Sequence, residues 1–137
     1  MTIGRLTLSE WQGNRVRERV VTTPSLSEVE AGLRRLDNSG FNDLYLHPNA
    51  ADDKTYLCVG GGAGRYVLAG AVGDNHFPTL VDLARPIDPP ELLIVGGQAG
   101  LYARNRVHDL PTALDVVRAY WATGELPDVG LSWVATE

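Results

Sequence analysis

The sequence predicts an α+β domain in which two helices pack against an antiparallel β-sheet of about five to seven short strands. Two segments have apolar residues at helical spacing, and several short segments are rich in β-branched and aromatic residues. Glycine, proline, asparagine and aspartate separate the short segments at close intervals. Because no helix stands between most of the expected strands, parallel crossovers are excluded there, and an antiparallel meander is the arrangement that remains.

The first helix is marked by its start signal and by its apolar spacing. Ser25 and Glu28 follow Pro24 as a capping box, in which each side chain can accept a hydrogen bond from a free backbone amide. The residues that recur at helical spacing form one apolar stripe: Leu26, Val29, Leu33 and Leu36. The Asn-Ser-Gly sequence at 38–40 is a stop signal, and we expect the helix to end there.

Short apolar segments bounded by turn residues account for the sheet. The candidate strand segments are residues 3–8, 17–22, 41–47, 54–59, 65–72, 79–83, 91–95, 100–104 and 130–134. The glycine-rich segments 60–64 and 96–100 are interpreted as flexible hairpin turns. Neither has the spacing of a nucleotide-binding motif, and a strand follows where such a motif needs a helix.

The second helix is expected to begin near Pro111, since proline has no amide to leave unpaired in the first helical turn. Gly124 stands where a C-terminal cap belongs. The residues that share one face of this helix are Ala113, Leu114, Val117, Tyr120 and Trp121. On this spacing Trp121 belongs to the core, and Trp133 in the last strand is expected there too.

Length and composition indicate one domain covering residues 1–137, with no repeat, linker or low-complexity tract. The single cysteine, Cys58, lies in an apolar run and is expected to be a buried, inert thiol. The N-terminus lacks the features of a signal peptide, and no segment approaches the ~18 apolar residues of a membrane span. We therefore expect a cytoplasmic protein.

The charge distribution predicts a protein partner. The net charge of −5 disfavours direct binding to nucleic acid, which needs a basic face, and suits a basic protein. The excess acid lies in the middle of the chain, in loops where it can face a partner. From charge and expected exposure we predict these partner-binding residues: Asp52, Asp53, Asp74, Asn75, His76, Phe77, Asp82, Asp88 and Glu91.

No pattern predicts a catalytic residue, a metal site or a cofactor. The three histidines, His47, His76 and His108, are far apart and show no metal-ligand spacing. Nothing in the sequence around Cys58 indicates an exposed or activated nucleophile. The paired carboxylates at 52–53 stand in a polar loop and not in an apolar pocket that would raise a carboxyl pKa.

The closing segment, residues 110–127 and 131–133, resembles the signature of the first immunity-protein family (Imm-one type) of bacterial polymorphic toxin systems. That family ends in a proline-started helix, an aromatic pair, a Thr-Gly-x-x-Pro turn and a short strand with tryptophan. The matching positions, which we expect to serve as scaffold, are Pro111, Tyr120, Trp121, Gly124, Pro127 and Trp133.

The resemblance implies that the chain is the antitoxin of a cognate secreted toxin, which it binds one-to-one and blocks at the active site, without a cofactor. Members of the family are commonly paired with deaminase toxins that act on nucleic-acid bases. Such a toxin needs a basic groove to hold phosphates, and an acidic inhibitor can occupy that groove.

Two other function classes remain open on the sequence alone. One is a non-enzymatic small-ligand-binding or regulatory domain that uses the glycine-rich hairpins. The other is an enzyme of unrecognised type, which would need a deep pocket with convergent polar groups.

Overall fold

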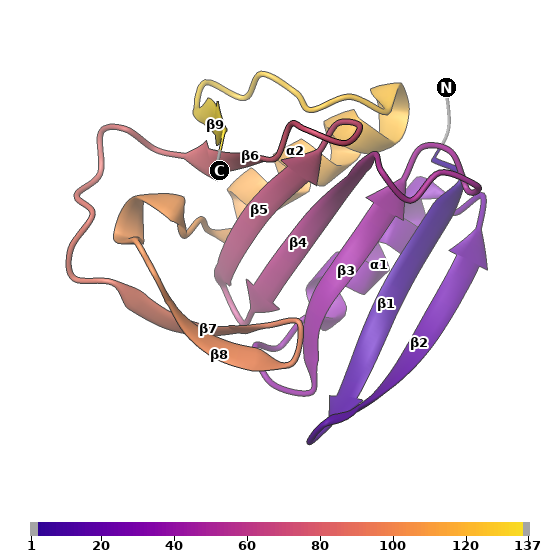
Figure 1. Ribbon diagram of the computed structural model, residues 1–137, viewed down its shortest axis with the longest axis horizontal. Coiled ribbons are helices and arrows are strands. Elements are labelled where there is room, and N and C mark those ends of the chain that lie inside the picture. Colours follow the sequence, from indigo (N-terminus) through magenta and orange to yellow (C-terminus); the bar gives the residue numbers. More distant parts are fainter. Residues whose placement is uncertain (1–2, 136–137) are drawn as a thin grey trace.

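The computed structural model describes residues 3–135, and its main feature is a seven-stranded antiparallel sheet (Figure 1). The strand order is β2-β1-β3-β4-β5-β6-β9, and a separate hairpin consists of β7 and β8. The elements are β1 (Arg5–Gln12), β2 (Arg15–Thr22), α1 (Leu26–Arg35), β3 (Phe41–His47), β4 (Tyr56–Gly62), β5 (Arg65–Ala71), β6 (Pro78–Val81), β7 (Glu91–Val95), β8 (Gln98–Tyr102), the short 3-10 helix η1 (Arg104–Arg106), α2 (Leu110–Thr123) and β9 (Ser132–Ala135). The predicted α+β fold class is confirmed.

Both helices lie on one face of the sheet, behind it in Figure 1. The main core forms between that face and the helices, where Leu44 and Leu57 from the sheet and Leu33 and Val117 from the helices are fully buried. No helix among residues 3–135 is both long and apolar enough to cross a membrane.

The helix ends follow the signals in the sequence. In α1 the Glu28 amide donates to Ser25 Oγ at 3.1 Å, and the Ser25 amide donates to Glu28 Oε1 at 2.9 Å, which completes the capping box. In α2 the Asp109 carboxylate accepts from the Thr112 amide, and Gly124 has the left-handed conformation of a C-cap. These caps fix where each helix begins and ends.

The closing segment packs as a scaffold around α2. Tyr120 is buried, with 1% of its surface exposed, and Pro111 lies in the first turn of the helix. Both tryptophans are half-buried against the core, and each indole donates to a proline carbonyl: Trp121 to Pro24 at 2.9 Å and Trp133 to Pro127 at 2.7 Å. These two bonds tie the helix and the last strand to neighbouring loops.

The interpretation of residues 60–64 as a flexible turn is wrong in part. Gly60, Gly61 and Gly62 are the buried end of β4, and the turn to β5 is made by Ala63 and Gly64. The glycines are needed because other parts of the chain come very close. A Cβ atom at Gly60 would lie 2.5 Å from Cγ1 of Val95, and one at Gly62 would lie 2.3 Å from the Leu36 backbone.

Other boundaries differ from the prediction because cross-strand pairing extends the strands. β1 and β2 form one long hairpin that runs to Gln12 and back from Arg15, where only residues 3–8 and 17–22 were expected to be extended. In the second glycine-rich segment, Gly96 and Gly97 do form a hairpin turn, but residues 98–100 belong to β8.

We predict that Gly60→Ala lowers the free energy of unfolding by about 1–3 kcal/mol, because the new methyl group would overlap the stiff Val95 side chain. Urea denaturation measures this. Gly40→Ala is the matched control, since its Cβ would meet nothing closer than 3.5 Å. Adding Val95→Ala should restore most of the loss. Equal stability of Gly60→Ala and the unmodified protein would contradict the packing described here.

Candidate functional site

The face of the main sheet that is turned away from the helices is only partly covered. The β7–β8 hairpin crosses one end of it, in front of the sheet in Figure 1, and leaves the rest uncovered. Strand pairing aligns one side chain from each strand across this face: Val20, Thr7, Tyr45, Cys58, Ala69, Thr79 and Val134. We call this row, together with His47 and Tyr56, the open face.

Three aromatic rings form a cluster near the centre of the open face. The ring centroids of Tyr45 and Tyr56 lie 5.3 Å apart in an edge-to-face arrangement, and those of His47 and Tyr56 lie 5.6 Å apart. The rings come together because Tyr45 pairs with Cys58 across β3 and β4, and His47 and Tyr56 each stand two residues from that pair, toward the same end of the face. Both tyrosines are half-buried and keep exposed surface.

A shallow cavity adjoins the aromatic cluster. It has a volume of about 420 Å³ and is lined by the two tyrosines and His47, by Thr7 and Val20, and by the charged residues Arg5, Glu18 and Asp53. Large aromatic side chains with a polar rim are the composition of protein-binding hot spots.

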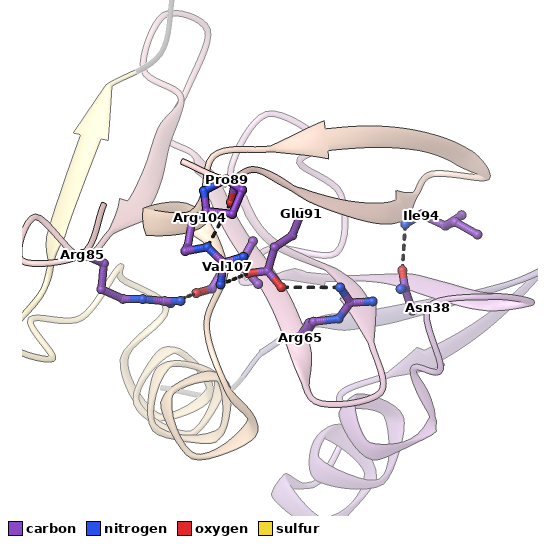
Figure 2. A network of polar contacts seen from close by, with 8 residues as sticks. All are labelled: Asn38, Arg65, Arg85, Pro89, Glu91, Ile94, Arg104 and Val107. Carbon is purple, nitrogen blue, oxygen red and sulfur yellow. Dashed lines mark hydrogen bonds and ion pairs between the residues drawn. The ribbon is translucent and has the colours of Figure 1, made fainter. Parts of the chain in front are cut away.

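The hairpin that bounds the open face is fixed to the rest of the fold by polar contacts (Figure 2). The Ile94 amide donates to Asn38 Oδ1 at 2.7 Å. At the start of β7, Glu91 accepts from Arg65 at 3.4 Å and lies 3.9 Å from a guanidinium nitrogen of Arg104. Figure 2 shows Glu91 between these two arginines, which come from different elements. The hairpin therefore has a defined position before any partner binds.

The loop between β6 and β7 is held by the same network. Arg104 donates to the Pro89 carbonyl at 2.9 Å, and Arg85 donates to the Val107 carbonyl. This loop presents Leu83 and Ile87 to solvent, with 72% and 61% of their surfaces exposed.

An apolar patch extends the open face at its β9 edge. Leu83, Ile87 and Leu101 line a cavity of about 460 Å³ together with Val134, which belongs to the open-face row. Leu101 is 70% exposed. A set of large apolar side chains exposed together marks an interaction surface more clearly than any one of them alone.

The structure brings six of the nine predicted partner-binding residues to one end of the open face. They lie in the loops that follow β3 and β5: Asp52, Asp53, Asp74, Asn75, His76 and Phe77. An ion pair of 3.0 Å between Lys54 and Asp74 joins the two loops, and the Gly73 amide donates to Thr55. We call these six residues the acidic end.

The other three predicted residues, Asp82, Asp88 and Glu91, lie apart from the acidic end, in or next to the loop between β6 and β7. Asp82 accepts a hydrogen bond from the Ala84 amide within its own turn, and Asp88 is exposed. Glu91 is largely buried between two arginines, as described above, and its side chain is 14% exposed.

Sequence reasoning did not select Tyr45, Tyr56 or the apolar residues around Leu101. The signal for the tyrosines was present, because each alternates with leucines that enter the core, so the tyrosines had to face the other side of the sheet. The apolar patch had no such signal, since it joins a loop, a hairpin and the last strand, which are far apart in the sequence.

Burial and neighbouring charge shift the pKa values of groups on the open face. Burial lowers the pKa of His47, and the positive charge of Arg5 adds to this effect. Arg5 also donates to Asp53 at 2.6 Å, and this hydrogen bond lowers the pKa of that carboxyl. Burial raises the pKa of the Cys58 thiol to about 12, so at neutral pH it is not the thiolate that nucleophilic chemistry requires.

Residues 3–135 contain no cluster of three or more histidine, cysteine, aspartate or glutamate side chains that could hold a metal ion. The open face offers aromatic and apolar contact surface, a fixed hairpin at one side and carboxylates at one end. These are the properties of a surface that binds another macromolecule.

The model of a known family, described as Immunity protein Imm1, matches residues 17–135 of the chain. The match covers the acidic end and all of the open face except the part contributed by β1. No curated protein and no solved structure is significantly similar to the chain.

The lowered pKa of His47 predicts a loss of stability in mild acid. An unfolded histidine titrates near 6.5 and the folded one below that value, so the unfolded chain binds more protons as the pH falls below 6.5. Stability should be highest above pH 6.5 and should decrease toward the pKa of the folded state. In urea denaturation, His47→Gln should lose less stability between pH 7.5 and 5.5 than the unmodified protein. The loss that remains in this variant is due partly to the buried His108, whose pKa is also lowered. Identical pH dependence in His47→Gln and the unmodified protein would contradict the assignment.

Proposed function

This chain belongs to the Imm1 immunity-protein family, and from that premise we propose that it neutralises a nucleic-acid deaminase toxin by covering the toxin's active site with its open face. Membership of this family implies that the protein is an immunity protein and that its partner is a cognate toxin. The deaminase chemistry of that toxin, a one-to-one complex and action in the cytoplasm are parts of the proposal. The chain acts by binding and catalyses no reaction.

The observation that carries the proposal is the uncovered aromatic face of the main sheet. A sheet buries its apolar side chains on at least one face, and the helices here already provide that core. On the other face Tyr45 and Tyr56 pack around the buried His47 and keep part of their rings exposed, which adds aromatic surface that the core does not use. A partner that covers these rings would remove that surface from water.

The fixed position of the hairpin favours tight binding. Because Glu91 and Asn38 already hold β7, the surface beside it loses little conformational freedom when a partner docks. Tyrosines contribute large contact areas at a low entropic cost, since each has only two side-chain torsions to fix. The open face therefore combines contact area with preorganisation.

The acidic end fits the charge that a deaminase toxin must carry. An enzyme that holds a nucleic-acid strand presents basic residues to the phosphates near its active site. Asp53 and Asp74 lie at the edge of the open face, and both side chains are largely exposed to solvent. Opposite charge would draw the two proteins together and orient the open face over the catalytic groove.

Neutralising the acidic end should slow association with the toxin. We expect the triple variant Asp52→Asn, Asp53→Asn and Asp74→Asn to associate about 3–10 times more slowly at low salt, and the difference should disappear at high salt. The measurement is surface plasmon resonance with the proposed deaminase toxin domain, together with an assay of its inhibition. Asparagine is chosen because it preserves the turn hydrogen bond that Asp52 accepts from the Lys54 amide.

The matched control neutralises three carboxylates on the helix side of the molecule, Asp115, Glu125 and Asp128, by the same type of substitution. All three side chains are exposed. If both triple variants slow association equally, net charge alone is responsible and the acidic end has no special role. If the toxin neither binds nor is inhibited, the proposed function is wrong.

A further inference from the structure

We propose that a groove between α1 and the edge of the sheet binds an acidic amphipathic helix of the toxin polypeptide, as a second contact separate from the open face. This inference rests on the proposed function, since it assigns the helix to the toxin. The groove lies on the helix side of the sheet, over β1 and β2. It has a volume of about 520 Å³, the largest of the cavities described for this molecule.

The groove exists because the layer of helices does not reach the edge of the sheet. α1 packs over the central strands and α2 over β5, while β2 lies at the sheet edge beyond α1 (Figure 1). The floor of the groove is apolar and is made by Leu6, Leu8 and Val21. Its wall on α1 contains Ala31 and Gly32, and such small residues allow another backbone to approach closely.

The rim of the groove is positively charged. Arg19 on β2 and Arg34 and Arg35 at the end of α1 line it, and all three are exposed. The one carboxylate in the lining, Glu28, is engaged in the capping box of α1. The rim therefore favours an anionic occupant.

The arginines of this region form no ion pair within the part of the chain that the structure describes. None of five arginines on β2 and α1 forms an ion pair with any residue between 3 and 135: Arg15, Arg17, Arg19, Arg34 and Arg35. Arg35 instead lies over the Phe41 ring, 4.5 Å from its centroid. In a protein with a net charge of −5, a basic surface without internal partners is suited to an acidic one on another molecule.

An amphipathic helix fits both features of the groove. Its apolar stripe would cover Leu8 and Val21, and it would occupy the position next to α1 where the helical layer ends. Glutamate or aspartate on its flanks would meet Arg19 on one side and Arg34 on the other. Nucleic acid would meet the arginines too, but it has no apolar stripe to place on the floor.

The test uses a fluorescein-labelled amphipathic peptide of about 14 residues, long enough to form a helix, built from leucine and glutamate. Fluorescence anisotropy with the full chain should show binding in the micromolar range that weakens with added salt. The double variant Arg19→Glu and Arg34→Glu should raise the dissociation constant about tenfold. The double variant Arg19→Lys and Arg34→Lys should retain binding, because the charge is preserved, and Arg106→Glu, outside the groove, should have no effect.

Three results would overturn the inference. The first is equal binding of a peptide in which lysine replaces every glutamate, and the second is unchanged peptide binding by the Arg19→Glu and Arg34→Glu double variant. The third is an oligodeoxythymidine that binds this surface while the acidic peptide does not. The toxin is not present in this experiment. A chain that inhibits its toxin normally but does not bind the peptide would refute the second contact and leave the proposed function intact.

Discussion

The β7–β8 hairpin can lie against the main sheet only because β4 has no side chain at Gly60, where Val95 fills the space. At the hairpin turn, Gly97 similarly allows close contact with the ring of Trp11. These two close approaches set the distance between hairpin and sheet, and the Asn38–Ile94 hydrogen bond holds it. The hairpin therefore covers one end of the sheet face, and Tyr45 and Tyr56 toward the other end keep exposed surface. The position of a small element far from the helices thus determines which surface a partner can reach.

The two faces of the main sheet differ in charge as well as in how far other elements cover them. Carboxylates gather at one end of the open face, whereas arginines that form no ion pair within residues 3–135 gather around β2 and α1 on the helix side. Since the first group suits a basic partner surface and the second an acidic one, a single toxin chain that meets both would be held in one orientation. This separation of charge explains how a protein with a net charge of −5 can carry a basic groove.

The sequence was sufficient for the elements whose signals are local. Ser25 and Glu28 predicted the start of α1, and Pro111 and Gly124 predicted the limits of α2, because caps act within one helical turn. The glycines of β4 were misinterpreted as a turn because the residues that require them are distant in sequence. These residues are Val95 and Leu36, which leave no room for a side chain on the strand. The residues of the acidic end were selected from charge and expected exposure, and their role in binding stays a prediction. The open face was not, since it depends on strand register and on where the hairpin docks, and both are set by tertiary contacts.

Hydroxyl-radical footprinting of the chain, alone and in complex with its cognate toxin, locates the surface that the toxin covers. If the toxin binds the open face, Tyr45, Tyr56 and Leu101 lose reactivity in the complex, while the half-buried Trp121 on α2 reacts equally in both states. Protection of Trp121 with unchanged reactivity of the two tyrosines would show that the toxin binds the helix side, and it would contradict the assignment of the open face.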